Sequence, residues 1–247
     1  MIPFSHLGKG ERVMRFGSAV AAITMVFMAA VGAVDAARAD ETVSIGGSQA
    51  VLIKPAAPRA SVILMPGGDG NIAAGPGGAI GRLKGNQLVR TRKAYAAHGL
   101  AVLVVDADVN LKAAVDYMRK IKTPVTVIGT SRGTLRAAQG IAAGARPDAL
   151  VLTSGFLTAG SGSGENVAAI LGSPARLPRT LVIHHRQDGC RFTQPAGVAP
   201  FIAWAGGRAR VVWLDGGVSV GNPCKARAYH GFNGLDGRVV GLAAGFR

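Results

Sequence analysis

The sequence predicts an α/β fold in a single domain, with a mostly parallel central sheet and helices on both of its faces. Short apolar segments rich in Val, Ile and Leu alternate along the chain with segments of helical character, as in repeated β-α units. The apolar segments are nearly continuous and do not alternate with polar residues, which indicates strands buried on both faces. The 247 residues, 49% of them hydrophobic, suffice for one sizeable core.

Residues 1–39 are expected to lie outside this fold, so the predicted α/β domain covers residues 40–247. Lysine and arginine side chains between positions 9 and 15 precede the uncharged segment 16–34, and small residues follow it up to Ala39. This order is typical of a secretory signal peptide with cleavage after Ala39. Because the uncharged segment is close to the roughly 18 residues of a membrane span, retention as an anchor is the alternative.

The apolar segments are predicted to be strands because they are short, rich in β-branched residues and bounded by turn-forming residues. In chain order they are 50–53, 61–65, 101–105, 125–129, 149–153, 180–185 and 210–214. The helices predicted between and after them are 88–98, 111–120, 132–143, 194–205 and 237–246. A long glycine-rich loop, residues 67–86, follows the second strand.

A serine between two glycines lies where strand 125–129 passes into the helix expected from Arg132. Gly129 and Gly133 lie where larger side chains would collide across a tight strand-to-helix turn, so they allow the Ser131 hydroxyl to be exposed from a strained backbone. This pattern indicates a nucleophilic serine. An ordinary helix N-cap is the alternative interpretation of Ser131.

A serine nucleophile needs a neighbouring general base, and four histidines follow residue 39. His230 is the best candidate, because it lies in a loop between the last strand and the last helix, where the chain order serine, acid, histidine places the base. His98 is interpreted as a residue at a helix C-terminus. His184 and His185 end a strand and are interpreted as structural groups or as neighbours of the site.

The base needs an orienting carboxylate, and Asp188 is the preferred candidate. It lies in the loop directly after strand 180–185, from which a carboxylate can reach a histidine in the next loop and stabilise the imidazolium that forms. Asp215, directly after the last strand, is the competing candidate. Either aspartate could instead be a turn residue beside glycine.

Two cysteines, Cys190 and Cys224, are present, and both lie after the predicted signal peptide. An oxidising compartment allows such a pair to form a disulfide, which is the expected state. The bond would join the loop of Asp188 to the loop of His230. A zinc site is not expected, because the chain offers too few Cys and His residues at ligand spacing.

Three segments together resemble the α/β-hydrolase superfamily over residues 51–247. The Gly-Thr-Ser-Arg-Gly segment looks like its nucleophile elbow, Arg-Gln-Asp-Gly like its acid loop, and Tyr-His-Gly-Phe-Asn-Gly like the histidine loop of dienelactone-hydrolase-like members. The glycine-rich loop is similar to that of small exported bacterial members. Pro66 stands where many members have histidine, and Ser131 stands where dienelactone hydrolases proper have cysteine.

The resemblance implies a periplasmic or secreted serine hydrolase that cleaves an ester-like bond, in a small molecule or a polymer, through an acyl-enzyme. Ser131 would attack, His230 would be the base and Asp188 would orient it. The backbone N–H groups of Arg132 and Gly68 would bind the oxyanion, with Asp69 as the alternative to Gly68. No metal or organic cofactor is implied, and peptidases and thioesterases share this machinery.

The chain is strongly basic, with 28 Lys and Arg residues, 13 Asp and Glu residues and a formal net charge of +15. A run of cations occurs within residues 82–93, namely Arg82, Lys84, Arg90, Arg92 and Lys93. The run predicts either a solvated face or a surface for an anionic substrate or an anionic envelope surface. Nucleic acid is not an expected partner. A non-catalytic envelope-binding protein on a hydrolase scaffold is the second functional hypothesis.

Overall fold

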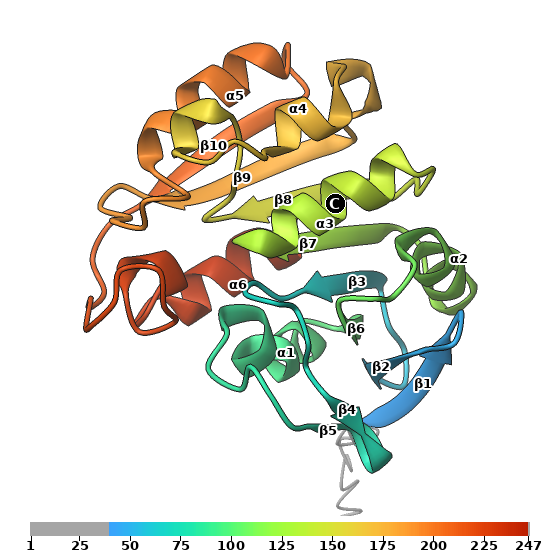
Figure 1. Cartoon of the computed structure of the whole chain (residues 1–247). Helices are drawn as coiled ribbons and strands as arrows, with labels where there is room; N and C mark the ends of the chain where they lie inside the picture. Colours follow the sequence, from blue (N-terminus) through green and yellow to red (C-terminus); the bar gives the residue numbers. More distant parts are fainter. Residues whose placement is uncertain (1–39, 247) are drawn as a thin grey trace, which may run out of the picture. The chain divides into compact units, whose positions relative to one another are not determined.

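Eight strands form the central sheet in the computed structural model, which describes residues 40–246 (Figure 1). The order across the sheet is β1-β2-β6-β3-β7-β8-β9-β10. The strands are β1 (Glu41–Ile45), β2 (Ser48–Ile53), β3 (Ala60–Met65), β6 (Leu100–Val105), β7 (Val125–Thr130), β8 (Ala149–Thr153), β9 (Arg179–His185) and β10 (Ala209–Leu214). The pairs β1–β2 and β2–β6 are antiparallel, and all other neighbours are parallel. The predicted fold class is therefore confirmed.

Helices cover both faces of the sheet. They are α1 (Gln87–Ala97), α2 (Leu111–Ile121), α3 (Arg132–Ala142), α4 (Val167–Leu171), α5 (Val198–Trp204) and α6 (Asp236–Gly245). Successive residues of a strand point to opposite faces of the sheet, so the buried side chains form two clusters. One cluster includes residues of α2 to α5, and the other includes residues of α1 and α6. Ile63 belongs to the first cluster and its neighbours Val62 and Leu64 to the second, as the period of a strand requires.

The elements that the sequence analysis did not predict are short or lie at an edge. β1 is an edge strand with a largely polar, half-exposed sequence, and α4 has 5 residues. Two-residue strands β4 (Ala74–Gly75) and β5 (Ala79–Ile80) pair inside the glycine-rich loop. The helix predicted over 194–205 is shorter, because Pro195–Gly197 forms a 3-10 turn and α5 begins at Val198.

The parallel strands place the loops after β3, β7 and β9 at one edge of the sheet. These loops contain Gly68, Ser131 and Asp188 respectively. Among residues 40–246, no helix is both long enough and apolar enough to span a membrane. The predicted signal peptide, and the alternative anchor, lie outside the described residues.

Candidate active site

Ser131 occupies the turn between β7 and α3 in an unusual backbone conformation. Its φ and ψ angles are 54° and −127°, a region that non-glycine residues rarely adopt and that costs on the order of 1–3 kcal/mol. The Ser131 N–H donates to the Thr153 carbonyl at 3.0 Å, and the Ser131 carbonyl accepts from the Thr134 N–H at 2.9 Å. The Ser131 side chain makes no capping hydrogen bond to α3, so the geometry disfavours the N-cap interpretation.

The glycines around Ser131 are required by close backbone contacts. A Cβ on Gly129 would lie 2.7 Å from the Gly133 carbonyl oxygen, across the turn as predicted. A Cβ on Gly133 would overlap the carbonyl oxygen of Met65, which belongs to β3 and not to the turn. A Cβ on Gly67 would lie 2.9 Å from the Ser131 Cβ. The turn is therefore packed against the end of the neighbouring strand as well as against itself.

His230 and Asp188 form a buried pair. His230 Nδ1 lies 3.0 Å from Asp188 Oδ2, and the two residues are 6% and 3% exposed. The second carboxylate oxygen, Oδ1, accepts from the Cys190 N–H at 2.9 Å. A proton on Nδ1 that is held by the carboxylate leaves Nε2 of the neutral ring as the basic atom.

Asp215, the competing candidate for the acid, lies in a different environment. Its carboxylate contacts the Arg186 side chain at 3.3 Å, and both side chains are more than half exposed. The structure thus brings Asp188 to His230, and Asp215 to Arg186.

Ser131 and His230 line one small pocket of about 60 Å³. Its other lining residues are Gly67, Gly68, Asn86, Gln87, Thr130, Cys224, Ala226 and Gly231. Asp188 lies behind the imidazole, away from solvent. Ser131 and His230 therefore line one pocket at the edge of the sheet where the parallel strands end, and the Asp188 carboxylate contacts His230 from its buried side.

Solved structures with similar folds are esterases and a dienelactone hydrolase. Est1E from Butyrivibrio proteoclasticus has a TM-score of 0.56 at 14% identity, with 84% of this chain and 97% of that chain covered. The esterase domain of a Rhodothermus marinus protein has a TM-score of 0.55 at 16% identity, covering 83% and 97%. Dienelactone hydrolase from Anabaena variabilis has a TM-score of 0.50 at 15% identity, covering 83% and 94%. The chain has the α/β-hydrolase fold. No protein-family model and no curated protein matches it.

Within this α/β-hydrolase fold, the two backbone groups expected to bind an oxyanion lie beside Ser131. Arg132 is the first residue of α3, so its N–H has no acceptor inside the helix. Gly68 lines the pocket, as does Gly67, which the sequence analysis did not single out. Asp69 pairs instead with Arg82 at 2.7 Å, and both side chains are about half exposed. The presence of Gly68, and not of Asp69, among the residues that line the pocket favours Gly68 as the second donor.

Arg136 of α3 holds the loop that contains Gly68. Its guanidinium donates to the carbonyl oxygens of Pro66 and Gly68. Burial lowers the pKa of Arg136, as does the nearby positive charge of Arg132. Sequence analysis did not identify Arg136, because nothing in the helix pattern distinguishes it from a solvent-exposed arginine.

Thr193 and His184 surround the Asp188 carboxylate. The fully buried Thr193 hydroxyl donates to Asp188 Oδ2 at 3.0 Å and also lies 3.0 Å from His230 Nδ1. His184 Nε2 lies 2.9 Å from the Thr193 carbonyl oxygen, to which it donates. His184 therefore supports the acid loop and does not replace His230 as the base.

His185 supports the same region from the other side. Its Nε2 donates to the Gly216 carbonyl at 2.9 Å, and its Nδ1 accepts from the Gln187 N–H at 3.0 Å. The ring stacks on Tyr229, the residue before His230, with 4.3 Å between centroids. These contacts agree with the structural interpretation of His184 and His185.

Two further residues hold the loop of His230: Ser154, which the sequence analysis did not single out, and Arg90, which it named only as a member of the basic run. The Ser154 hydroxyl donates to the His230 carbonyl at 2.8 Å from a backbone with a φ of 43°. The Arg90 guanidinium donates to the Gly231 carbonyl at 2.7 Å and to both carboxylate oxygens of Asp236, at 2.7 and 2.8 Å. The local signal of Ser154 is its position directly after β8 and before a glycine.

The basic run 82–93 is largely engaged within the protein. Besides the Arg90 and Arg82 pairs, Arg92 and Lys93 lie 3.5 and 3.8 Å from the Asp40 carboxylate. Arg82 and Lys93 keep more than half of their side chains exposed, so the choice between a solvated face and a surface for anions stays a prediction for these residues. Arg82 pairs within the glycine-rich loop, whereas Arg90 and Arg92 join α1 to Asp236 and Asp40.

Cys190 and Cys224 form a disulfide, as predicted. The bond joins the two loops of the site directly, because the Cys190 N–H donates to Asp188 and Cys224 lines the pocket with His230. The sequence separation is 34 residues.

A Cys190→Ser, Cys224→Ser variant, which lacks the disulfide, is expected to lose hydrolytic activity toward a test ester while its sheet stays folded. A displacement of about 1 Å in a catalytic group can lower the rate about 100-fold, whereas the lost loop closure destabilises the fold by roughly 3–4 kcal/mol. Hydrolysis and far-UV circular dichroism, followed together at low temperature, test this. A folded variant with full turnover would show that the bond only stabilises the chain.

Stability is expected to fall as the pH falls from about 6.5 to 4, because of His184. Burial lowers its pKa to about 4, as do the nearby His230 and His185, against the opposing effect of Asp188 and of the Thr193 hydrogen bond. In this window the unfolded chain binds a proton that the folded chain excludes, which lowers the free energy of unfolding by roughly 3 kcal/mol. Urea unfolding of wild type and His184→Gln at pH 7 and 4.5 measures it. Equal losses in the two proteins would contradict the assignment to His184.

Proposed function

We propose that the chain is an exported serine hydrolase that cleaves an ester-like acyl bond with Ser131, His230 and Asp188. The observation that carries the proposal is the buried Asp188–His230 pair, with His230 and the strained Ser131 lining one pocket. The names of the structural neighbours Est1E and the Rhodothermus marinus esterase domain support an ester as the substrate. The small pocket volume favours a compact acyl group.

The reaction follows from the position of each group. Ser131 Oγ attacks the substrate carbonyl carbon while His230 Nε2 takes the hydroxyl proton, and Asp188 stabilises the imidazolium. The Arg132 and Gly68 N–H groups donate to the oxyanion, each contributing about 3–4 kcal/mol. His230 then returns the proton to the leaving alkoxide, which departs as an alcohol. Water attacks the acyl-enzyme by the same route and releases the acid and free Ser131.

Covalent labelling with a fluorophosphonate tests the nucleophile. Mass spectrometry of the wild type should show one adduct, located on Ser131, with parallel loss of p-nitrophenyl acetate hydrolysis. The Ser131→Ala protein should form no adduct and should not hydrolyse p-nitrophenyl acetate. The Ser173→Ala protein, in which a capping serine outside the pocket is changed, should form the adduct and hydrolyse the ester as the wild type does. A folded wild type that never labels would refute the enzyme and favour the non-catalytic envelope-binding alternative. Amide and thioester substrates distinguish peptidase and thioesterase activity.

Export to the periplasm or medium is the second part of the proposal. The disulfide supports it, because such bonds persist in oxidising compartments. Intact mass and N-terminal sequencing of protein from the exported fraction should give a chain that starts at Asp40 and has no titratable thiol. An exported chain that retains Met1 would instead indicate an anchor.

A further inference from the structure

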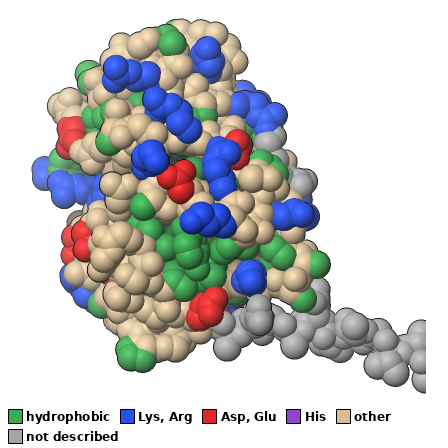
Figure 2. Space-filling view, turned by 90° about the vertical axis from the view of Figure 1, so that its right-hand side faces the viewer, with side chains coloured by type: hydrophobic (Ala, Val, Ile, Leu, Met, Phe, Trp, Pro, Cys, Tyr) green, Lys and Arg blue, Asp and Glu red, His purple; other side chains and the backbone are tan. Residues whose placement is uncertain are grey.

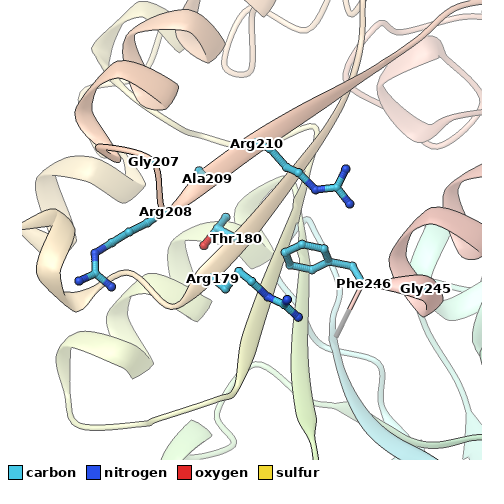
Figure 3. Close-up of a pocket in the computed structure, with 8 residues that line it drawn as sticks. All are labelled: Arg179, Thr180, Gly207, Arg208, Ala209, Arg210, Gly245 and Phe246. Carbon is cyan, nitrogen blue, oxygen red and sulfur yellow. The ribbon is translucent and has the colours of Figure 1, made fainter.

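A second hollow lies at the edge of the sheet opposite the candidate active site. Ser131 and Asp188 follow the ends of β7 and β9, whereas this hollow lies where β9 and β10 begin (Figure 3). Its volume is about 340 Å³, several times that of the pocket beside Ser131. The lining residues are Arg179, Thr180, Gly207, Arg208, Ala209, Arg210, Gly245 and Phe246.

Two of its arginines are arranged around an aromatic ring. The guanidinium carbons of Arg179 and Arg210 lie 4.9 and 5.4 Å from the centroid of the Phe246 ring. Figure 3 shows both side chains beside Phe246, while Arg208 extends away from the ring. Phe246 is buried, so it provides a fixed surface for the two guanidinium groups. Contact with the ring orders these side chains without neutralising their charge.

The positive surface continues beyond this hollow. An adjoining hollow of about 300 Å³ shares Arg208 and adds Arg146 and Arg176. Figure 2, which faces the side on which the parallel strands begin, shows more Lys and Arg side chains than Asp and Glu side chains. Within residues 40–246, none of the arginines of the two hollows forms an ion pair, and the nearby Asp148 pairs with Arg119 at 3.0 Å.

We propose that the hollow of Arg179, Arg208 and Arg210 binds a phosphate-bearing ligand. Guanidinium groups match phosphate oxygens in paired hydrogen bonds, and a phosphate group can accept from more than one arginine at once. A cluster of cations that has no carboxylate partner among residues 40–246 is stabilised by such an anion. The phosphate could belong to a soluble compound or to a phospholipid headgroup. The hollow and the pocket beside Ser131 are at opposite edges of the sheet. A phosphate ligand in the hollow would therefore leave the pocket beside Ser131 open to substrate.

Titration of the full chain with sodium tripolyphosphate, followed by calorimetry, tests the site. The variant Arg179→Gln, Arg208→Gln, Arg210→Gln should bind at least tenfold more weakly than wild type. The control Lys84→Gln, Lys93→Gln, Lys112→Gln loses the same charge from positions outside both hollows and should change affinity less than twofold. Ester hydrolysis should be the same in the wild type and in the arginine variant. If the triple arginine variant fails to fold, Arg210→Gln alone, at an exposed side chain, should still weaken binding measurably.

Two further measurements identify the source and the chemistry of the ligand. Sedimentation with phosphatidylglycerol vesicles, but not with phosphatidylcholine vesicles, would indicate a lipid headgroup, whereas binding of tripolyphosphate alone would indicate a soluble phosphate compound. The charge-retaining Arg179→Lys, Arg208→Lys, Arg210→Lys variant should lose affinity because lysine cannot make the paired hydrogen bonds. The proposal is overturned if neither tripolyphosphate nor phosphatidylglycerol vesicles bind, or if polyglutamate binds as tightly as tripolyphosphate. It is also overturned if the Lys84→Gln, Lys93→Gln, Lys112→Gln control loses as much affinity as the Arg179→Gln, Arg208→Gln, Arg210→Gln variant.

Discussion

Asp188→Asn is expected to lower kcat for a small ester by about 10⁴-fold, as the equivalent change does in serine proteases. The asparagine amide would donate to His230 Nδ1, which places the imidazole proton on Nε2, where the proton of Ser131 has to be received. The fold should persist, because the asparagine oxygen can take the place of Oδ1 and accept from the Cys190 N–H, while its NH2 group, in the place of Oδ2, can donate to the Thr193 hydroxyl oxygen as well as to His230. Hydrolysis of p-nitrophenyl acetate together with circular dichroism measures both effects.

Asp215→Asn is the matched control for this variant. Asp215 pairs with Arg186 at an exposed position, where an ion pair contributes at most about 1 kcal/mol. Its turnover should stay near that of the wild type. The opposite result, with normal turnover in Asp188→Asn and loss in Asp215→Asn, would show that Asp188 is not the acid.

Gly133→Ala is expected to destabilise the protein by at least about 3 kcal/mol or to prevent folding. Alanine normally stabilises a helix relative to glycine by roughly 0.5–1 kcal/mol. At this position in α3, however, the added Cβ would overlap the Met65 carbonyl oxygen of β3 and would lie 2.9 Å from that of Pro66. Both neighbours are backbone atoms at the end of a buried strand, so they cannot move aside as a side chain would.

Gly241→Ala is the control, because Gly241 lies within α6, where an added Cβ would meet no neighbouring group within 4 Å and the backbone has no positive φ. It should be neutral or stabilise by up to about 1 kcal/mol. Urea unfolding should therefore show a large loss of stability in Gly133→Ala and none in Gly241→Ala. A stable, active Gly133→Ala protein would contradict the packing of the Ser131 turn against β3.

Most of the sheet and helices could be predicted from local sequence because their signals are local. Residues 125–129 and 149–153 are continuous apolar segments, and both became buried parallel strands, β7 and β8. The failures occurred where local signals are weak. β1 is polar and half-exposed, and it is held by pairing with β2, which no local pattern in its 5 residues encodes.

The candidate site was predictable to a similar degree. Ser131 was detectable because its turn requires glycines at fixed spacing, and Asp188 and His230 because each follows a strand in a recognisable order. The roles of Thr193, Ser154 and Arg90 were not detectable, since each residue contacts the loop of His230 from far along the chain: 37 residues separate Thr193 from His230, 76 separate Ser154 from His230, and 141 separate Arg90 from Gly231.

The sequence by itself determined the order of the elements, the strained serine turn and the identity of the two cysteines, because periodicity, glycine spacing and cysteine number are properties of short segments. Only the tertiary structure decided which aspartate meets His230, because the choice between Asp188 and Asp215 depends on where neighbouring loops point. It also decided the role of the charges. The run 82–93 is mostly paired within the domain, whereas arginines from separate loops gather where β9 and β10 begin. These arginines are close in space because β9 and β10 are neighbouring parallel strands, although the residues are far apart along the chain.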